Sequence, residues 1–356
     1  MTEPPRPVAE DPVCQRPAPA PGACHRGLAE HGAAGRGPAP SLASPPPWVV
    51  VVNGAAGRRQ GEALAGVIRD AVSAAGCQVS VRQVARAGEL EATAAAAAAH
   101  AGALRGLLVA VGGDGTLNTV ARAAMGAGVA FSAIPQGTFN YFGRCHGFPA
   151  DPAEAVAAVL GGHLRPVQVG SLNGRIFLVN ASFGLYPRLL EDREAFKQQW
   201  GRSRLTAWGA ALLTLLGQHR QHPIRLQAGA PDGPGVERSL TSSTVFVANN
   251  RLQLEQLGVP EAAELEAGRL VGLVLRPLGR GALLGLALKG ALGRLGEADA
   301  VERLVFRRLQ IEPGRRWWPA RDVAVAIDGE SIRMRPPLVF SVAERPLWLL
   351  APREAA

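Results

Sequence analysis

The chain has 356 residues, enough for two compact domains, and 47% of them are hydrophobic, as is ordinary for a protein that buries a core. Its formal net charge of +9 at pH 7 is compatible with binding to nucleic acid, to an anionic membrane surface or to a phosphorylated substrate, and does not discriminate among these partners. Four widely spaced cysteines and the lack of a long uninterrupted apolar run exclude a disulfide scaffold and a membrane-spanning helix, which favours a soluble, cytoplasmic protein.

Residues 1–47 are predicted to form a disordered tail rich in Pro, Ala and Gly. They hold 12 of the 28 prolines and almost no branched or aromatic side chains. Such a segment cannot bury enough apolar surface to offset the entropy that it loses on ordering. It also lacks the basic start and apolar block of a signal peptide, and none is expected. Order is predicted to begin at Trp48.

Residues 48–167 alternate strand-like and helix-like segments. The predicted strands lie at 48–52, 79–84, 104–111 and 130–134, and the predicted helices at 61–75, 92–101 and 117–125. Alternation of this kind argues for a parallel sheet with helices on both faces. The fold class predicted for this domain is therefore a three-layer, Rossmann-like α/β domain.

Residues 168–337 show a different pattern and are predicted to form a mainly antiparallel β domain. The strand-like runs lie at 176–180, 224–228, 243–248, 270–275, 304–311, 323–327 and 331–334. Two Arg-edged amphipathic helices, at 204–216 and 280–295, are interpreted either as packing helices or as a basic face toward a membrane. Within residues 338–356, a strand at 338–342 or 347–350 is expected to return to the first domain.

The segment Gly112-Gly113-Asp114-Gly115-Thr116 lies between a predicted buried strand and a predicted helix. Glycines let backbone N–H groups approach a polyphosphate, and the helix N-terminus adds its positive dipole end. The segment matches neither the P-loop nor the dinucleotide fingerprint. A carboxylate beside phosphates is repulsive unless a cation such as Mg²⁺ or a proton-transfer role offsets it. These residues therefore predict a phosphate-binding loop with a functional acid.

A second motif follows at the end of the next predicted strand, Pro135-Gln136-Gly137-Thr138-Phe139-Asn140-Tyr141-Phe142-Gly143-Arg144. Together the two motifs resemble the diacylglycerol kinase catalytic-domain family, which includes bacterial lipid kinases and sphingosine kinases and is distantly related to NAD kinases and phosphofructokinases. Tyr141 departs from the family pattern, which has an Asp in a carboxylate and metal network. The turn that begins at Asn53 resembles a third family motif. The resemblance covers the chain from Trp48 onward and implies a β-sandwich as the second domain.

The resemblance implies an ATP-dependent lipid kinase that transfers the γ-phosphate to a hydroxyl of diacylglycerol or a related lipid such as a sphingoid base. ATP and Mg²⁺ are the implied cofactors, with Asp114 as the implied metal ligand. The implied nucleotide-binding residues are Asn53, Gly57, Arg58, Gly112, Gly113, Asp114, Gly115, Thr116, Asn118, Gly137, Thr138 and Asn140.

Asp328-Gly329-Glu330 lies between two predicted strands. Asp-Gly is a strong signal for a two-residue hairpin and needs no chemistry to explain it. The family carries the same acidic pair at this place and uses it in catalysis. We therefore expect a hairpin that projects acids toward the interdomain cleft, with Asp328 as the first choice of general base and Glu330 and Asp114 as alternatives.

The expected partner is a lipid at a membrane surface, which allows peripheral contact with the inner membrane face and also allows a homodimer. Nucleic acid is not expected, because the basic charge comes without aromatic platforms or a recognised module. Two alternatives stay open. One is an NAD kinase-like enzyme, although no convincing Asn-Glu pair follows the second motif. The other is a catalytically inactive lipid- or nucleotide-binding module, suggested by Tyr141 and by Ala56 in place of the family Ser.

Overall fold

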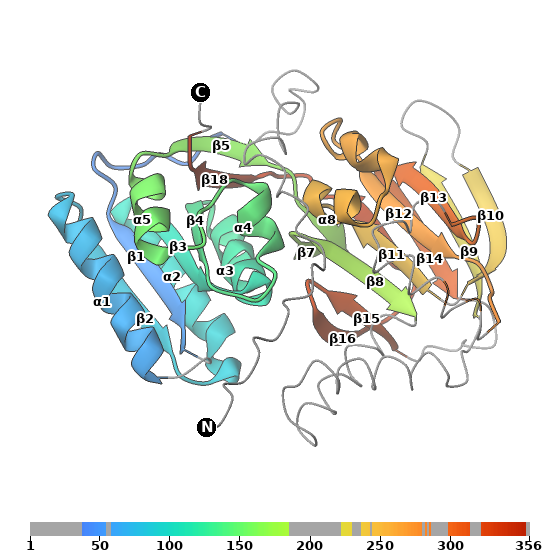
Figure 1. Ribbon diagram of the computed structural model, residues 1–356, viewed down its shortest axis with the longest axis horizontal. Helices are drawn as coiled ribbons and strands as arrows, with labels where there is room; N and C mark the ends of the chain where they lie inside the picture. The colour runs from blue at the N-terminus through green and yellow to red at the C-terminus, as the bar shows by residue number, and fades with distance from the viewer. Residues whose placement is uncertain are drawn as a thin grey trace, which may run out of the picture.

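The computed structural model describes residues 38–54, 58–184, 222–229, 236–242, 244–279, 282, 285, 298–313 and 322–353. They form two domains that lie side by side (Figure 1). The chain crosses between the two domains after β5, at residues 168–169, and returns before β18, at residues 343–346. The predicted fold class, a parallel-sheet α/β domain followed by an antiparallel β domain, is confirmed.

The first domain is built on a six-stranded sheet in the order β2-β1-β3-β4-β18-β5. Its strands are β1 (Trp48–Asn53), β2 (Val79–Val84), β3 (Leu107–Gly112), β4 (Ala130–Pro135), β5 (His163–Val167) and β18 (Leu347–Ala351). All neighbours run parallel except β5, which is antiparallel to β18. Strands β1, β3 and β4 are apolar and almost wholly buried, as expected for central strands that are covered on both faces.

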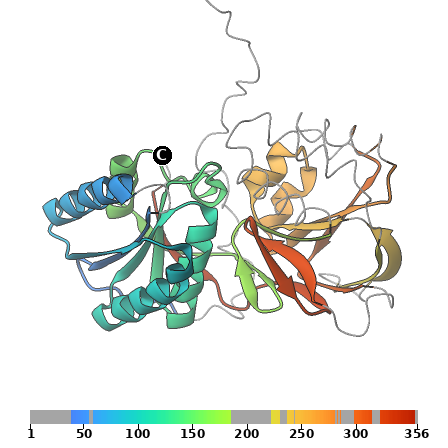
Figure 2. The same ribbon diagram turned by 90° about the horizontal axis from the view of Figure 1, so that it is seen from below.

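Helices cover both faces of this sheet (Figure 2). They are α1 (Arg58–Ala74), α2 (Leu90–Leu104) after the short 3₁₀ helix η2 (Ala87–Glu89), α3 (Asp114–Ala127), α4 (Tyr141–Cys145) and α5 (Pro152–Leu160). Helix α1 packs against α5 on one face, and α2 packs against α3 on the other. Helix α5 was not predicted, although Asp151 followed by Pro152 is a typical helix start. The Asp151 carboxylate caps it by accepting hydrogen bonds from the N–H groups of Ala153 and Glu154.

The second domain is a sandwich of two six-stranded antiparallel sheets, in the orders β10-β9-β14-β17-β6-β7 and β13-β12-β11-β8-β15-β16. The strands are β6 (Gly170–Leu172), β7 (Arg175–Phe177), β8 (Asn180–Gly184), β9 (His222–Gly229), β10 (Val236–Ser242), β11 (Thr244–Ala248), β12 (Leu270–Leu275), β13 (Val301–Phe306), β14 (Arg308–Pro313), β15 (Val323–Ile327), β16 (Glu330–Met334) and β17 (Leu338–Val342). Side chains of both sheets, including Phe177, Phe306 and Phe340, form one buried core. Helix α8 (Arg251–Gln256) and the 3₁₀ helix η3 (Pro260–Leu265) pack around a smaller cluster beside β12.

Two strand predictions in this domain were too coarse. The run at 176–180 contains parts of β7 and β8, and the run at 304–311 contains parts of β13 and β14. In each case the chain passes from one sheet to the other within the run, and a continuous apolar pattern does not mark that crossing. The predicted helices at 204–216 and 280–295 lie outside the described residues, apart from residues 282 and 285. In the part of the chain that is described, no helix is long and apolar enough to cross a membrane.

Both ends of the described chain correct the predicted boundaries. Residues 38–47 were assigned to a disordered tail, but the Ala43 N–H donates to the Arg105 carbonyl at 2.8 Å, and the Pro47 carbonyl accepts from the Leu107 N–H at 2.8 Å. At the other end, β17 pairs with β14 and β6 in the second domain, and β18 alone joins the first sheet. The returning segment therefore begins after Val342 rather than at Leu338.

Candidate active site at the domain interface

The predicted phosphate loop lies at the carboxyl edge of the parallel sheet, where β3 ends at Gly112 and α3 begins at Asp114. Thr116, in the first turn of α3, accepts a hydrogen bond on Oγ1 from Asn53 Nδ2 at 2.7 Å. A Cβ atom on Gly112 would lie 2.8 Å from the Thr116 Cβ atom, so that only glycine fits. Asn53, at the end of β1, therefore contacts the first turn of α3 beside the glycine loop.

A second glycine loop, Gln136–Asn140, lies directly against the first. The Gln136 N–H donates to the Gly112 carbonyl at 2.8 Å, and a Cβ atom on Gly137 would lie 2.6 Å from the Gly113 Cα atom. Asn140 has a positive φ of 51°, and its Oδ1 atom accepts from the Gly137 N–H at 2.6 Å. We call this backbone-to-backbone contact of the two loops the loop junction.

Asp114 joins the loop junction to α4. Its Oδ2 and Oδ1 atoms accept hydrogen bonds from the N–H groups of Tyr141 at 3.2 Å and Phe142 at 3.1 Å. Burial raises the pKa of Asp114, while these two N–H groups and the Arg144 charge oppose the rise. Because Tyr141 contributes its backbone N–H, this contact does not depend on the side chain that replaces the family Asp. The metal and catalytic roles expected of Asp114 stay predictions.

The predicted hairpin at Asp328-Gly329 is confirmed. Ile327 pairs with Glu330 across the turn, and Asp328 and Gly329 have positive φ angles of 46° and 87°. A two-residue turn with both φ angles positive matches the right-handed twist of its strands. This backbone turns the side chains of Asp328 and Glu330 toward different surroundings.

The Asp328 carboxylate is buried, with 8% of the residue exposed, and four donors surround it. Leu178 N–H donates to Oδ2 at 2.7 Å, and the N–H groups of Val179 and Asn180 each donate to Oδ1 at 2.9 Å. The fourth donor is Asn118 Nδ2, at 2.7 Å from Oδ2. Burial raises the pKa of Asp328 to about 6, and the four donors limit the rise.

Asn118 links the two domains, and its expected role in nucleotide binding stays a prediction. It lies one helical turn after Asp114 on α3, and its Nδ2 atom donates to the Ile176 carbonyl at 3.0 Å as well as to Asp328. The helix that begins at the phosphate loop is thus fixed to the second domain through one buried amide.

Glu330 is the acid that reaches the phosphate loop from the second domain. A Cβ atom on Gly115 would lie 2.9 Å from Glu330 Oε1, so the carboxylate lies against the first turn of α3. The residue as a whole is exposed. Burial of its carboxyl end raises the pKa of Glu330, and the charges of Arg175 and Arg122 lower it.

The structure says less about three of the other predicted site residues. Thr138 is exposed at the rim of the second loop. Arg58 begins α1, but its side chain is outside the described part of the structure, as is all of Gly57. These residues stay predictions.

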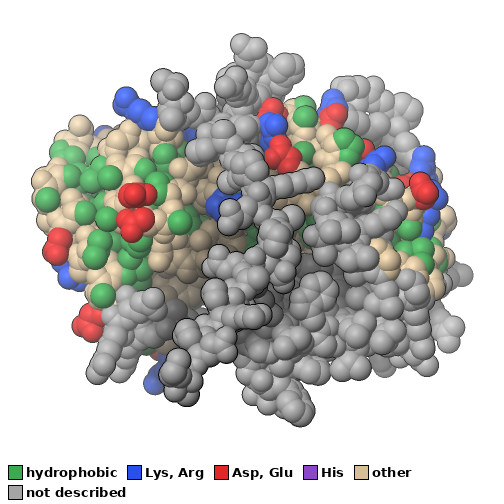
Figure 3. All heavy atoms as spheres, in the orientation of Figure 1, with side chains coloured by type: hydrophobic (Ala, Val, Ile, Leu, Met, Phe, Trp, Pro, Cys, Tyr) green, Lys and Arg blue, Asp and Glu red, His purple; other side chains and the backbone are tan. Residues whose placement is uncertain are grey.

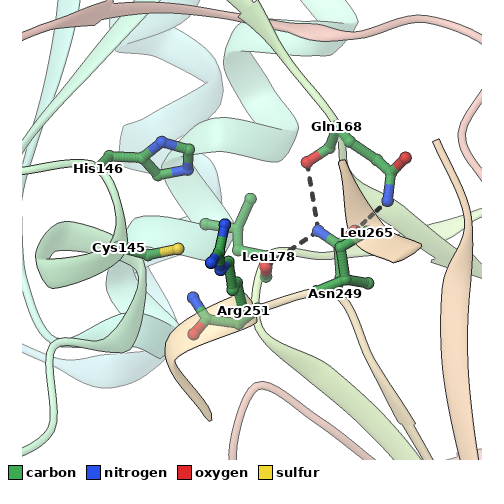
Figure 4. Close-up of a pocket in the computed structure, with 8 residues that line it drawn as sticks. Cys145, His146, Gln168, Leu178, Asn249, Arg251 and Leu265 are labelled. Atoms are coloured by element: carbon green, nitrogen blue, oxygen red, sulfur yellow. Dashed lines mark hydrogen bonds between the residues drawn. The ribbon is translucent and has the colours of Figure 1, made fainter. Parts of the chain in front are cut away.

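A small cavity lies between α4 of the first domain and α8 of the second (Figure 4). Its lining residues are Cys145, His146, Gln168, Leu178, Asn249, Asn250, Arg251 and Leu265. Asn250 Nδ2 donates to the Tyr141 carbonyl at 3.1 Å, so the wall of the cavity also fixes the start of α4. None of Asp114, Asp328 and Glu330 lines it, and we assign it to the domain contact rather than to the chemistry.

The described residues contain no group of three or more His, Cys, Asp or Glu side chains that could hold a metal ion. Mg²⁺ bound to a nucleotide needs only one or two protein carboxylates, because phosphate oxygens and water supply its other ligands.

Comparison with known proteins gives a consistent result. Residues 47–172 match the family model of the diacylglycerol kinase catalytic domain. The chain is 33% identical over 245 residues to a Pseudomonas aeruginosa protein named probable lipid kinase YegS-like, which covers 66% of this chain and 73% of that protein. It is 39% identical over 85 residues to a diacylglycerol kinase of Staphylococcus epidermidis, which covers 22% of this chain and 25% of that protein. A crystal structure of a diacylglycerol kinase from Bacillus anthracis superposes with a TM-score of 0.59 at 19% identity over 86% of this chain and 96% of the other, and supports the fold.

Proposed function

Because the chain belongs to the diacylglycerol kinase catalytic-domain family, we propose that it is an ATP-dependent kinase that phosphorylates a hydroxyl of diacylglycerol or of a related lipid such as a sphingoid base. The observation that carries the proposal is the meeting of three motifs at one interface. The two glycine loops pack together, and the Asp328–Glu330 hairpin contacts the helix that follows the first loop.

The phosphates of ATP are proposed to lie on the glycine loop at the N-terminus of α3. Backbone N–H groups and the helix dipole favour negative charge there, and the absence of Cβ atoms lets phosphate oxygens approach. Phosphoryl transfer depends chiefly on such positioning and on offsetting charge over the phosphoryl oxygens. When Mg²⁺ is bound to the nucleotide, it supplies part of that offset.

The lipid hydroxyl needs a proton acceptor, and the geometry favours Glu330 over Asp328 for this role. Both oxygens of Asp328 already accept two hydrogen bonds each inside the protein. The Glu330 carboxylate instead lies beside Gly115, and the residue Glu330 is exposed. This reverses the order of preference drawn from the sequence, and assigns to Asp328 the role of fixing the hairpin against α3.

The test is phosphate transfer from labelled ATP to a panel of lipids in mixed micelles, with diacylglycerol and sphingosine as the first members. We expect Glu330→Gln to lower kcat by about 100-fold or more while ATP binding and melting temperature stay near the wild-type values. Asp328→Asn should instead lower the melting temperature, because an amide nitrogen would face N–H donors. ATP binding without transfer to any lipid would refute the lipid kinase proposal, and NAD as the acceptor in the same assay tests the related alternative.

The lipid is proposed to be met at a membrane surface by peripheral contact, with the protein on the cytoplasmic side. On the face shown in Figure 3, the described charged side chains form small groups of mixed sign over both domains rather than one basic patch. Sedimentation with vesicles that contain increasing shares of anionic lipid measures the contact directly. Binding that does not rise with anionic lipid would exclude an electrostatic contact.

A further inference from the structure

Asn250 is a buried residue of the second domain whose side chain reaches the first domain. It directly precedes α8 and is 2% exposed. Its Oδ1 atom accepts a hydrogen bond from the Gln253 N–H at 3.0 Å, which caps the N-terminus of α8. Its Nδ2 atom donates to the Tyr141 carbonyl, at the start of α4, at 3.1 Å. One amide group therefore bonds to both domains.

The carbonyl that Asn250 reaches belongs to the same peptide group as the Phe142 N–H, which donates to Asp114 Oδ1 at 3.1 Å. The second domain thus holds the oxygen end of this peptide group, and the phosphate loop holds its nitrogen end. Because a peptide group is planar and rigid, the two hydrogen bonds act on one body. They also polarise it in the same direction, which strengthens both. The place of Asp114 relative to α4 therefore depends on a donor from the other domain.

The start of α4 is also continuous with the second glycine loop. Asn140 directly precedes Tyr141, and its Oδ1 atom accepts from the Gly137 N–H at 2.6 Å. Gly137 in turn lies against Gly113 in the loop junction. A displacement of the first residues of α4 would therefore reach both glycine loops.

Buried polar groups fix the orientation of the Asn250 amide from within the second domain. Gln253, whose N–H bonds Asn250, accepts on Oε1 from Asn180 Nδ2 at 3.2 Å. The Asn180 N–H donates to Asp328 Oδ1 at 2.9 Å, and Asn118 connects Asp328 back to α3. These residues are all buried. Since the Asn250 oxygen must face the Gln253 N–H, its amide N–H is directed at the first domain.

We propose that Asn250 is a positioning residue for the nucleotide site. It holds the peptide group between Tyr141 and Phe142, and through this group Asp114 and the second glycine loop, in the arrangement that receives the phosphates of ATP. The proposal rests on the proposed function only in placing the nucleotide at these loops. It makes nucleotide binding depend on the second domain, although both loops belong to the first.

The first test measures the affinity for a non-hydrolysable ATP analogue with Mg²⁺ by calorimetry, and needs no lipid. Asn250→Ser keeps a side-chain oxygen that is a good helix cap, but it lacks the amide N–H and is shorter. It should weaken binding by about tenfold or more, because the loops lose their fixed geometry. Asn250→Asp also keeps a capping oxygen and should weaken binding at least as much, since an oxygen then faces the Tyr141 carbonyl.

Asn173→Asp is the matched control. Asn173 Nδ2 donates to the carbonyls of Arg335 and Pro337, and its Oδ1 atom accepts from the Val339 N–H, all within the second domain. The substitution therefore removes the same kind of donor and keeps the same kind of acceptor away from the loops. It should leave the affinity for the analogue unchanged.

The second test follows α4 without any nucleotide, by hydrogen exchange of its backbone amides. The amides of Tyr141 and Phe142 should exchange about tenfold faster in Asn250→Ser than in the wild type, whereas those of α5 should exchange at the same rate. If no lipid is phosphorylated but affinity and exchange change in this way, the lipid kinase proposal fails and the inference about Asn250 stands.

Two results overturn the inference. In the first, Asn250→Ser and Asn250→Asp lower the melting temperature but leave the affinity and the exchange of α4 at their wild-type values, which would limit Asn250 to capping α8. In the second, Asn250→Ala weakens binding and Asn250→Ser restores it, because serine replaces the cap and not the amide donor. Either result leaves the proposed function intact. A wild-type chain that does not bind the analogue would refute both proposals.

Discussion

The loop junction and the β15–β16 hairpin both contact the start of α3, but they use different atoms to do so. In the junction, backbone lies against backbone, and Gly113 and Gly137 leave no room for a side chain. At the hairpin, side-chain carboxylates make the contacts, through Asp328 with Asn118 and through Glu330 beside Gly115. We therefore expect that a Cβ atom added at Gly113 or Gly137 disrupts the loop junction. The hairpin contacts are expected to respond to changes in the charge of their side chains instead.

The largest effect is expected for Gly137→Ala. The new Cβ atom would lie 2.6 Å from Gly113 Cα and 2.9 Å from Asn140 Oδ1, so the backbone of the two loops must separate. Displacement of this size should lower kinase activity by about 100-fold and stability by about 3 kcal/mol. Activity and thermal unfolding measure both.

Gly126→Ala is the control for that variant, since Gly126 lies on helix α3 and a Cβ atom there meets nothing within 4 Å. It should raise stability by about 0.5 kcal/mol because alanine favours the helix. Equal losses in Gly137→Ala and Gly126→Ala would show that the junction is no tighter than the helix surface.

The next effect is expected for Asn118→Ala, which removes one donor to Asp328 and should cost about 2 kcal/mol at pH 7.5. The folded pKa of Asp328 lies at about 6, above its ordinary value of 3.8, so the contribution of this group to stability is greatest below about pH 4 and falls as the pH rises through 6. Loss of the Asn118 hydrogen bond raises that pKa further and extends the fall to higher pH. Denaturant unfolding at pH 5 and pH 7.5 should therefore show a larger loss at pH 7.5. An equal loss at both values would contradict the ionisation of Asp328 between pH 5 and pH 7.5.

Gly115→Ala should have a smaller effect that distinguishes the two contacts. Its Cβ atom would meet Glu330 Oε1 at 2.9 Å, which is the end of a flexible side chain that can move. Stability should hold or rise slightly because Gly115 lies in a helical turn, while activity should fall by about tenfold as Glu330 is displaced. In a Glu330→Ala background the same substitution should cost no further activity. A further loss of activity in that background would show that the added Cβ atom acts on the loop itself rather than through Glu330.

The smallest effect is expected for Phe139→Ala. The Phe139 ring stacks on Tyr141 with centroids 5.7 Å apart, but Phe139 is 51% exposed. Its removal should cost about 0.5 kcal/mol in unfolding free energy and change the KM for ATP by less than about threefold. A large rise in KM for ATP would mean that the aromatic pair contacts the nucleotide.

The fold and the order of the motifs could be predicted because each depends on local pattern. Buried apolar runs define β1, β3 and β4, and Asp-Gly defines the hairpin turn. The direction of the acidic side chains could not be predicted, because the partners of Asp328 lie about 150 and 210 positions away along the chain.

For Arg122 the sequence contains a signal that the prediction did not use. Arg122 follows Asn118 by four positions, so both lie on one face of α3, and a charged residue there could have been assigned to the interface. Arg175 left no such signal, because its position beside Glu91 results from the crossing of the chain between domains.

The place of β18 has a consequence for how the protein is made. This strand lies between β4 and β5 in the first sheet, yet it follows the whole second domain along the chain. On a ribosome, β4 and β5 are synthesised early, and the position between them in the sheet stays empty until residues 347–351 have been synthesised. Until then their unpaired edges are exposed to other chains, and the second domain must fold without blocking the gap. The last strand thus makes completion of the first domain conditional on synthesis of the second.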